Sequence, residues 1–480
     1  MNEDTPPADG APDTMEDSLR DQSRPAGGAA RPYLFIVLEG DRPLSGGARF
    51  SLAGVDEVHI GRGDGRGDAR VAQVEPGARR LTLQIPSPSL SRLHARLRRV
   101  PMGWYLEDAG SRNGTYLNGE RVARGLVGPP DLVELGHAFL VVREIEQLAN
   151  SSDRDLDSAD LADEAPGWRT LLPNVAAGLE DLRRVASSAS LGVLLVGETG
   201  TGKEVLARAI HDCSRRPGPF VAVNCNTLAE GLVESQLFGH VKGAFSGAVA
   251  DSIGFVRAAD RGTLLLDEIG DLGASAQGAL LRVLQEREVV PVGRAAAQKV
   301  DVRFLATTLR PLDIGAGQTQ FRSDLFARLS GFVYTMMPLR ERREDLGLLI
   351  AMLLRKSGVS ESDRPRIAPD LGLALLRHGW PLNVRELEQL LLRTWLLADG
   401  GLMSGAPRFV AAGEATRSAS AAPASRSLSA DDEAMHRQVA DALAATGGNI
   451  SAAARALGKG RIQLHRLMKR LGVDARQFKG

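Results

Sequence analysis

The chain has 480 residues, of which 43% are hydrophobic and 25% charged, and its 59 basic side chains equal its 59 acidic ones in number. This length predicts several domains, and two cysteines, Cys213 and Cys225, exclude a disulfide framework or a cysteine-rich zinc fold. No apolar run reaches the roughly 18 residues of a membrane span, so we expect a cytoplasmic protein.

The first segment, residues 1–31, is acidic, rich in proline and poor in large apolar side chains. It has no apolar core of a signal peptide, and it cannot bury enough apolar surface to fold. A disordered tail is therefore predicted.

Residues 32–146 contain short apolar runs separated by glycine, proline and asparagine turns. The runs are YLFIVLEG, EVHIGR, RLTLQI, LHARLRRV, GWYLED, VELG and FLVVREI. Such spacing is typical of an all-β sandwich. Polar groups lie at its turns: Gly61-Arg62, SRLH at 91–94, DAGSRNGT at 108–115 and Asn118-Gly119. Arginines with hydroxyl and amide donors on converging loops can bind a phosphate dianion.

An acidic linker is predicted at 147–166, and the pattern then changes. From 167 to 408, apolar strands such as LGVLLVG and GTLLLDE alternate with longer helical stretches. This alternation favours an α/β domain with a parallel sheet and crossover helices.

A P-loop follows the first of these strands and opens a helix. Its glycines let backbone N–H groups surround phosphate oxygens, and its lysine reaches the β- and γ-phosphates. The expected ATP-binding residues are Gly197, Glu198, Thr199, Gly200, Thr201, Gly202, Lys203 and Glu204. Glu204 stands where the general motif has serine or threonine.

The strand GTLLLDE ends in Asp267 and Glu268. A hydrophobic strand ending in two carboxylates is a Walker B element. Asp267 is expected to hold Mg²⁺, and Glu268 to polarise the attacking water.

A second linker is predicted at 409–430, followed by an all-α helix-turn-helix at 431–480. We expect Asn449 to cap a short alanine-rich helix that ends at Gly458, and a basic helix to follow from Arg461 to Leu471. The expected DNA-binding residues are Arg461, Gln463, His465, Arg466, Lys469 and Arg470.

The central segment resembles the AAA+ domain of sigma-54-dependent transcriptional activators. The stretches that carry the resemblance are GETGTGKE, VNC, ESQLFGHVKGAFSGA, GTLLLDEIGDL, LLRVLQEREVVPVG, FRSDLFARL, PLRERREDL and GWPLNVREL. Glu204 is itself that family's version of the loop.

The resemblance implies further roles in ATP hydrolysis. Asn224 restrains the catalytic Glu268, and Arg322 and Arg328 act in trans on the neighbouring subunit's ATP. Arg385 is the sensor II arginine of a helical lid that begins at about 340. A site completed in trans implies a homo-oligomer, from dimer to hexamer.

The stretch GAFSGA corresponds to the loop with which this family engages sigma-54. The implied contact residues are Gly243, Ala244, Phe245, Ser246, Gly247 and Ala248. Glycines and alanines allow a tight tip that exposes the aromatic ring.

Three residues depart from the family pattern. Ser246 replaces threonine, Leu309 replaces the sensor I asparagine, and Leu382 replaces a glycine beside the sensor II arginine. A leucine side chain cannot hydrogen-bond water or phosphate, so the hydrolysis rate is in question.

The N-terminal segment resembles the forkhead-associated (FHA) domain, which recognises phosphothreonine. The resemblance assigns phosphopeptide binding to Arg62, Ser91, Arg92, Arg112 and Asn113, and a bracing role to His94. It implies a phosphothreonine-containing partner and a Ser/Thr kinase. The C-terminal segment resembles the Fis-type DNA-binding domain.

Together these features predict a sigma-54-dependent regulator that binds DNA and remodels the sigma-54 RNA polymerase closed complex by ATP hydrolysis. Phosphothreonine recognition would gate it. The alternatives are a hydrolysis-deficient regulator that binds DNA and phosphopeptide, and an AAA+ ATPase acting on another target.

Overall fold

The computed structural model describes residues 30–71, 78–146, 153–188, 191–229, 231–309, 312, 314–315 and 321–405, together with positions 442, 446 and 456. By their contacts, residues up to Ala411 form one compact unit and Ala412–Gly480 a second. Within the described residues, no helix has the length and apolar character needed to cross a bilayer.

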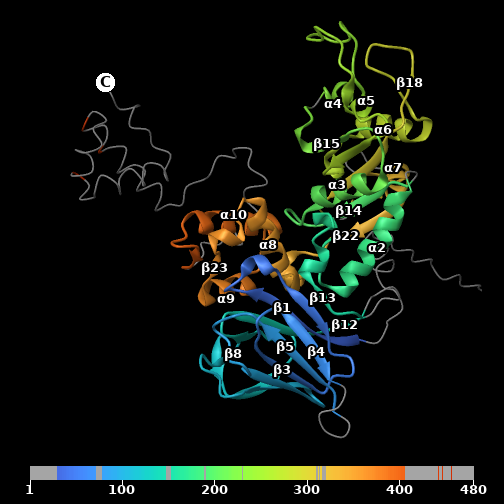
Figure 1. Ribbon diagram of the computed structural model, residues 1–480. Helices are drawn as coiled ribbons and strands as arrows, with labels where there is room; N and C mark the ends of the chain where they lie inside the picture. Colours follow the sequence, from blue (N-terminus) through green and yellow to red (C-terminus); the bar gives the residue numbers. More distant parts are fainter. Residues whose placement is uncertain are drawn as a thin grey trace, which may run out of the picture. The chain divides into compact units, whose positions relative to one another are not determined.

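Two packed sheets form the N-terminal sandwich (Figure 1). One sheet has the strand order β13-β2-β1-β12-β11-β8-β9, and the other the order β10-β7-β6-β3-β5-β4. Their bounds are β1 (Ala30–Glu39), β2 (Ala48–Ser51), β3 (Glu57–Arg62), β4 (Gly67–Val71), β5 (Arg80–Ile85), β6 (Ala95–Val100), β7 (Gly103–Asp108), β8 (Thr115–Leu117), β9 (Glu120–Val122), β10 (Arg124–Val127), β11 (Val133–Leu135), β12 (Ala138–Glu146) and β13 (Leu156–Asp157). The all-β sandwich predicted for this segment is present.

Strand β1 is buried on both faces, which explains its continuous apolar run. Leu34 and Ile36 belong to the core between the two sheets. Tyr33, Phe35 and Val37 point the other way, into a second core that the sandwich shares with the helices of residues 346–396. The alternation of a strand thus divides β1 between two cores.

Residues 153–166 of the segment expected as an acidic linker are part of the folded unit. This segment forms β13 and two short 3-10 helices, η2 (Ser158–Leu161) and η3 (Pro166–Trp168). Asp153 accepts hydrogen bonds of 2.9 Å from the hydroxyls of Tyr33 and Ser51. Arg66 forms ion pairs with Glu39 and Asp157. Asp153 and Asp157 therefore hold this segment against the sandwich.

The central domain has a parallel sheet in the order β15-β16-β19-β14-β22. Alternate residues of its strands face two separate cores, so the sheet is covered on both sides. The strands are β14 (Val193–Val196), β15 (Phe220–Asn224), β16 (Thr263–Asp267), β19 (Arg303–Thr308) and β22 (Phe332–Thr335). The helices include α2 (Pro173–Ser187), α3 (Lys203–Ser214), α4 (Val233–Phe238), α5 (Gly254–Ala258), α6 (Ala274–Glu286) and α7 (Ser323–Leu329). This is the predicted α/β architecture.

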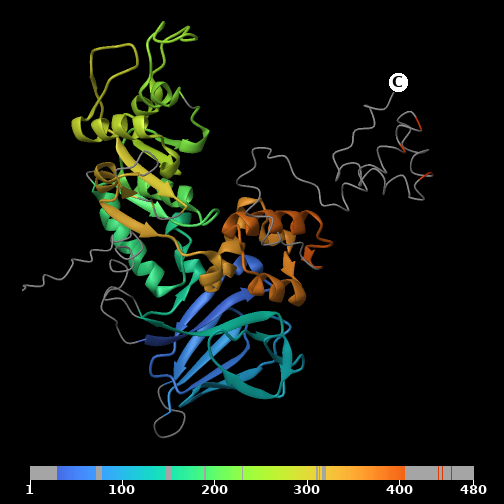
Figure 2. The ribbon, with the colours of Figure 1, turned by 180° about the vertical axis from the view of Figure 1, so that it is seen from behind.

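A helical lid follows, as predicted from about residue 340. It contains η6 (Leu339–Glu341), η7 (Arg343–Asp345), α8 (Leu346–Lys356), α9 (Pro369–Arg377) and α10 (Asn383–Leu396), with the short strands β23 (Arg366–Ile367) and β24 (Leu402–Met403). Figures 1 and 2 both show the lid helices lying against β1 of the sandwich.

Candidate functional site

The loop between β14 and α3 is shaped to surround a phosphate chain. Gly200 and Gly202 have φ values of +78° and +102°, a region that favours glycine. Lys203 opens α3 and is 7% exposed. Its ammonium donates to the carbonyls of Gly197 (2.7 Å) and Glu198 (3.3 Å). The loop, the helix N-terminus and the lysine meet at one point, as phosphate binding requires.

Asp267 is the last residue of the buried strand β16, and Glu268 follows it beside Lys203. The Lys203 Nζ lies 3.7 Å from Glu268 Oε1, and the Leu309 N–H donates to Glu268 Oε2 at 3.1 Å. Burial raises the pKa of Glu268, although Lys203 acts in the opposite direction. Burial likewise lowers the pKa of Lys203 against the effect of Glu268. The carboxylate of Glu268 is therefore a stronger base than one in water.

Asp267 offers oxygen atoms of the kind that Mg²⁺ prefers. Thr307 Oγ1 donates to one carboxylate oxygen, and Asn224 Nδ2 approaches the other at 3.4 Å. The residues present thus fit a magnesium ion at the end of β16.

Asn224 hydrogen-bonds to Asp267, whereas the family resemblance implied a restraint on Glu268. The reason is register, because the parallel pairing of β15 and β16 places Asn224 opposite Asp267. Glu268 has a left-handed backbone (φ +55°) and turns toward Lys203 and Leu309.

The lid contacts the P-loop directly. Asn383, fully buried at the start of α10, donates to Glu198 Oε2 (3.1 Å) and to the Thr199 carbonyl (3.0 Å). The Val384 N–H donates to the Gly200 carbonyl at 3.0 Å. A Cβ on Gly200 would lie 2.1 Å from the Leu382 carbonyl, so this position requires glycine.

Leu382 is compatible with its backbone, although it replaces a glycine of the family pattern. Its φ of −108° lies in the region that any residue adopts. Arg385 is one turn further along α10, and its Cβ lies 3.0 Å from where a Gly200 Cβ would be. The expected sensor II arginine is thus placed beside the P-loop.

Sequence reasoning missed the lid residues that hold Glu198. Arg340 and Asn383 both donate to its carboxylate. The hydrogen bond from Arg340 holds the pKa of Glu198 below its ordinary value. The arginine-rich run PLRERREDL was the available signal, but only the fold shows which arginine reaches the loop.

A cavity of about 500 Å³ lies beside the P-loop. Val175 and Leu179 of α2, Leu206 of α3 and Met352 of α8 line it. An apolar cavity next to a phosphate-binding loop suits a planar nucleotide base.

Arg322 and Arg328 lie at the two ends of α7 (Ser323–Leu329). Arg322 forms an ion pair with Asp324, and both arginines are exposed. Within the described part of the chain, neither bonds to Lys203, Asp267 or Glu268. Glu204 is also exposed and pairs with Arg208.

The GAFSGA loop is folded back rather than extended. The Gly243 N–H donates to the Ala248 carbonyl (2.8 Å), and the Ala248 N–H to that of Phe245 (3.0 Å). The Phe245 ring is half-buried, 5.0 Å from the His240 ring in an edge-to-face contact. The aromatic ring that was expected to be exposed at the tip is therefore partly covered, while Ser246 is exposed.

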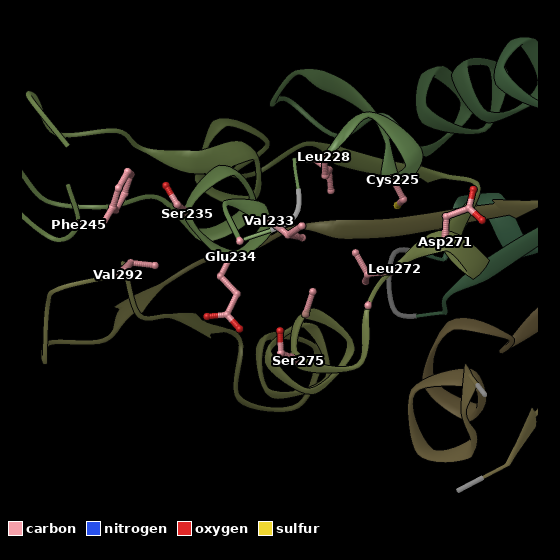
Figure 3. A pocket seen from close by; sticks show the side chains of 13 residues that line it. Cys225, Leu228, Val233, Glu234, Ser235, Phe245, Asp271, Leu272, Ser275 and Val292 are labelled. Carbon is pink, nitrogen blue, oxygen red and sulfur yellow. The ribbon is translucent and has the colours of Figure 1, made fainter. Parts of the chain in front are cut away.

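Phe245 also borders a cavity of about 470 Å³ (Figure 3). Figure 3 shows Phe245 and Val292 at one end of this cavity and Cys225 and Asp271 at the other. The loop thus borders a cavity that extends toward the carboxyl ends of β15 and β16.

The proposed phosphopeptide loops converge at one end of the sandwich. A Cβ on Gly61 would lie 1.9 Å from the Arg92 carbonyl oxygen, so the position before Arg62 requires glycine. The Ser91 hydroxyl accepts from the Arg112 N–H at 3.1 Å, and Asn113 Nδ2 donates to the Ser89 carbonyl at 2.8 Å.

His94 is fully buried and connects two of these loops. Its Nδ1 accepts from the Ser91 N–H (3.3 Å), and its Nε2 lies 3.1 Å from the Gly114 carbonyl. Burial lowers the pKa of His94, which favours the neutral ring that this arrangement needs.

The guanidinium groups of Arg62, Arg92 and Arg112 are exposed around this site. Among the described residues, no carboxylate forms an ion pair with any of the three. They are free to receive an anionic ligand.

The expected DNA-binding residues lie outside the described residues. They are Arg461, Gln463, His465, Arg466, Lys469 and Arg470.

Four family models match the chain in succession. They are described as FHA domain (58–136), Sigma-54 interaction domain (172–335), AAA+ ATPase lid domain (340–418) and Bacterial regulatory protein, Fis family (436–471).

The chain also resembles curated proteins named Anaerobic nitric oxide reductase transcription regulator NorR. It is 40% identical to that of Aeromonas salmonicida over 368 residues, which cover 72% of this chain and 71% of the relative. It is 42% identical to that of Citrobacter koseri over 318 residues, covering 64% and 63%. Among solved structures, NtrX from Brucella abortus aligns at 30% identity and a TM-score of 0.42, covering 62% of this chain and 68% of that one.

Proposed function

Because this chain belongs to the family of sigma-54-dependent transcriptional regulators, we propose that it hydrolyses ATP to remodel the sigma-54 RNA polymerase closed complex. The observation that carries the proposal is the meeting of Lys203, Glu268 and the lid residue Asn383 at one phosphate-binding loop. The chain has FHA, AAA+ and Fis-type domains in one polypeptide.

In the proposed reaction, the loop amides and Lys203 bind the phosphates, and the apolar cavity holds the base. Asp267 would hold Mg²⁺, which would supply positive charge to the phosphate site. Glu268 accepts a proton from the attacking water, because its buried carboxylate is basic and close to the phosphate site. Lys203, its ion-pair partner, would move to the phosphates once ATP is bound.

We infer that Arg322 and Arg328 act on the ATP of a neighbouring subunit in a homo-oligomer. Their exposure, and the lack of a bond from either to Lys203, Asp267 or Glu268 among the described residues, support this assignment. An arginine placed in trans neutralises charge on the transferred phosphoryl group.

The remaining surfaces have proposed partners of distinct chemistry. Phe245 would leave His240 and dock on sigma-54. Arg62, Ser91, Arg92, Arg112 and Asn113 would bind phosphothreonine, and the basic C-terminal helix would bind double-stranded DNA in the cytoplasm.

A hydrolysis-deficient regulator is the second candidate, and the leucine at position 309 is the observation that favours it. Two measurements separate the candidates: ATP hydrolysis by the purified full chain over a concentration series, and transcription from a sigma-54 promoter. We expect activity per subunit to rise with concentration, and Glu268→Gln to bind ATP without hydrolysing it. Lys203→Ala is the blank. ATP binding with no hydrolysis at any concentration would favour the second candidate.

A further inference from the structure

The outer face of the sheet containing β1 and β12 is a dedicated docking surface for the lid. Tyr33, Phe35 and Phe139 are fully buried in one cluster with Leu346 and Leu375 of the lid. Loops and exposed polar residues are typical of transient contacts between domains, whereas this contact is a continuous apolar core.

Glycines in the lid bring the two backbones unusually close. A Cβ on Gly347 would lie 2.4 Å from the Val37 carbonyl oxygen, and one on Gly372 would lie 2.6 Å from the Phe139 ring. Nine in ten real Cβ contacts are longer than 3.4 Å, so the fit depends on glycine at these places. The lid and the sandwich are therefore matched to each other in detail.

Polar contacts fix the register of this interface. Arg143 of β12 pairs with the buried Glu344 of the lid. Arg355 donates to the Leu44 carbonyl at 2.6 Å. The Ile367 N–H of β23 donates to the Gly40 carbonyl at 2.7 Å, so a lid strand bonds to the turn after β1.

The residue after Gly40 supports the phosphopeptide loops. Asp41 accepts hydrogen bonds from Ser89 Oγ (3.1 Å) and from Ser87, and lies 2.7 Å from His137 Nδ1. Ser89 in turn accepts from Asn113 through its carbonyl. The turn at Gly40 and Asp41 thus bonds to the lid on one side and to the peptide loops on the other.

The same lid bonds to the P-loop at its other end. Asn383 and Val384 hold the P-loop backbone, and Arg342 donates to the Thr201 carbonyl at 3.1 Å. Arg342 and Glu344 lie two residues apart, so one short segment contacts both the nucleotide loop and the sandwich.

We propose that the FHA domain and the lid form one body, in which the Gly40–Asp41 turn couples phosphothreonine-peptide binding to nucleotide binding at the P-loop. This inference rests on the proposed function, because it requires both ligands to bind. Coupling between two binding sites is reciprocal, so each ligand changes the affinity for the other by the same factor.

The test measures the Kd of a methylanthraniloyl-ADP probe for the full chain by fluorescence. One series contains a library of short peptides with a central phosphothreonine and degenerate flanks, and a matched series contains the unphosphorylated library. We expect the phosphorylated library to change the nucleotide Kd by at least about fivefold, a typical lower bound for allosteric coupling. The unphosphorylated library should change nothing.

Two variants then test the turn. Gly40→Ala adds a methyl group that would lie 2.6 Å from the Ile367 carbonyl oxygen, and Asp41→Asn weakens the bonds to His137 and the serines. Each is expected to bind both ligands separately with the coupling factor reduced toward one. Asp56→Asn is the matched control, because Asp56 accepts from the Arg79 N–H just before β3 and at the opposite end of that strand from Arg62. It should keep the full factor.

Binding of both ligands to the wild-type chain without any mutual effect would overturn the inference and leave the proposed function standing. Full coupling in both Gly40→Ala and Asp41→Asn would also overturn it, because the turn would then play no part. If the phosphorylated library does not bind at all, the phosphothreonine part of the proposed function fails, and this inference fails with it.

Discussion

The backbone N–H of Leu309 donates a 3.1 Å hydrogen bond to the carboxylate of Glu268. Leu309 occupies the position at which the family pattern has an asparagine. The residue is 41% exposed, and its side chain contains no group that can donate or accept. The main chain at this position therefore holds the proposed base, while the side chain offers nothing to the water or the phosphate.

Leu309→Asn should accelerate ATP hydrolysis. An asparagine amide would add one hydrogen bond to the reacting groups, and the backbone bond to Glu268 would remain. A gain of about tenfold in kcat corresponds to about 1.4 kcal/mol. Steady-state hydrolysis by the full chain measures it.

Leu309→Ala is the control for side-chain size and should leave kcat close to the wild-type value. An unchanged kcat in Leu309→Asn would show that the backbone bond already suffices and that this departure has no catalytic cost.

Phe245→Ala should separate hydrolysis from transcription. The ring packs on His240 and touches neither Lys203 nor Glu268 among the described contacts, so hydrolysis should change less than about twofold. Loss of an aromatic anchor costs about 2 kcal/mol or more, which is roughly 30-fold in affinity for sigma-54. Val249→Ala is the matched control, since Val249 is 82% exposed and lies next to the loop. Equal transcription from both variants would contradict the assigned docking role.

Arg62→Ala should abolish most phosphothreonine binding. Hydrogen bonds to charged groups contribute about 1.5–3 kcal/mol, so the Kd should rise roughly 10- to 150-fold. Fluorescence anisotropy with a phosphothreonine peptide library reports the change. Arg99→Ala should bind the peptide normally. Arg99 is exposed near the carboxyl end of β6, and the site lies at the opposite end of that strand. Similar losses in the two variants would mean that general positive charge, rather than this site, attracts the peptide.

Asp345 predicts an unusual pH dependence of stability. It is 1% exposed and accepts from the Thr170 hydroxyl (2.8 Å) and the Leu171 N–H (2.7 Å). Burial raises its pKa to about 6. The folded chain therefore takes up a proton between pH 6 and 4 that the unfolded chain does not, and stability from this group increases as the pH falls through 6.

Asp345→Asn should remove this component. Between pH 7 and pH 5 the wild-type chain should gain about 1 kcal/mol relative to the variant, because the asparagine amide does not titrate. Thermal unfolding of both proteins at the two pH values measures the difference. A parallel shift in the two proteins would show that Asp345 is not the group that titrates.

Several strands could be predicted to the residue from the sequence. EVHIGR, RLTLQI and GWYLED coincide with β3, β5 and β7, because their alternation reports one buried face. The three-residue strands β8 and β9 were not predicted, since strands this short carry no periodicity.

The P-loop and the Walker B strand could also be predicted from the sequence, because each is a run of contiguous residues. The contacts of Glu198 with Arg340 and of Asn113 with Ser89 could not, since each joins loops whose meeting depends on the whole fold. The run YLFIVL did contain a sign of the lid interface. A strand that is apolar at every position must be covered on both faces, and only the structure identifies what covers the second one.

That second covered face of β1 has a consequence for how the chain can change over generations. Substitutions at Tyr33, Phe35 or Val37 meet the lid, and those at Leu34 or Ile36 meet the sandwich core, so a change of volume at any of these positions is felt by packed neighbours. A recombination that joined this sandwich to an unrelated lid would leave these rings facing water and the lid glycines facing the wrong surface. We therefore expect substitutions in the sandwich face and in the lid to be coupled, although the α/β core separates the two in the sequence.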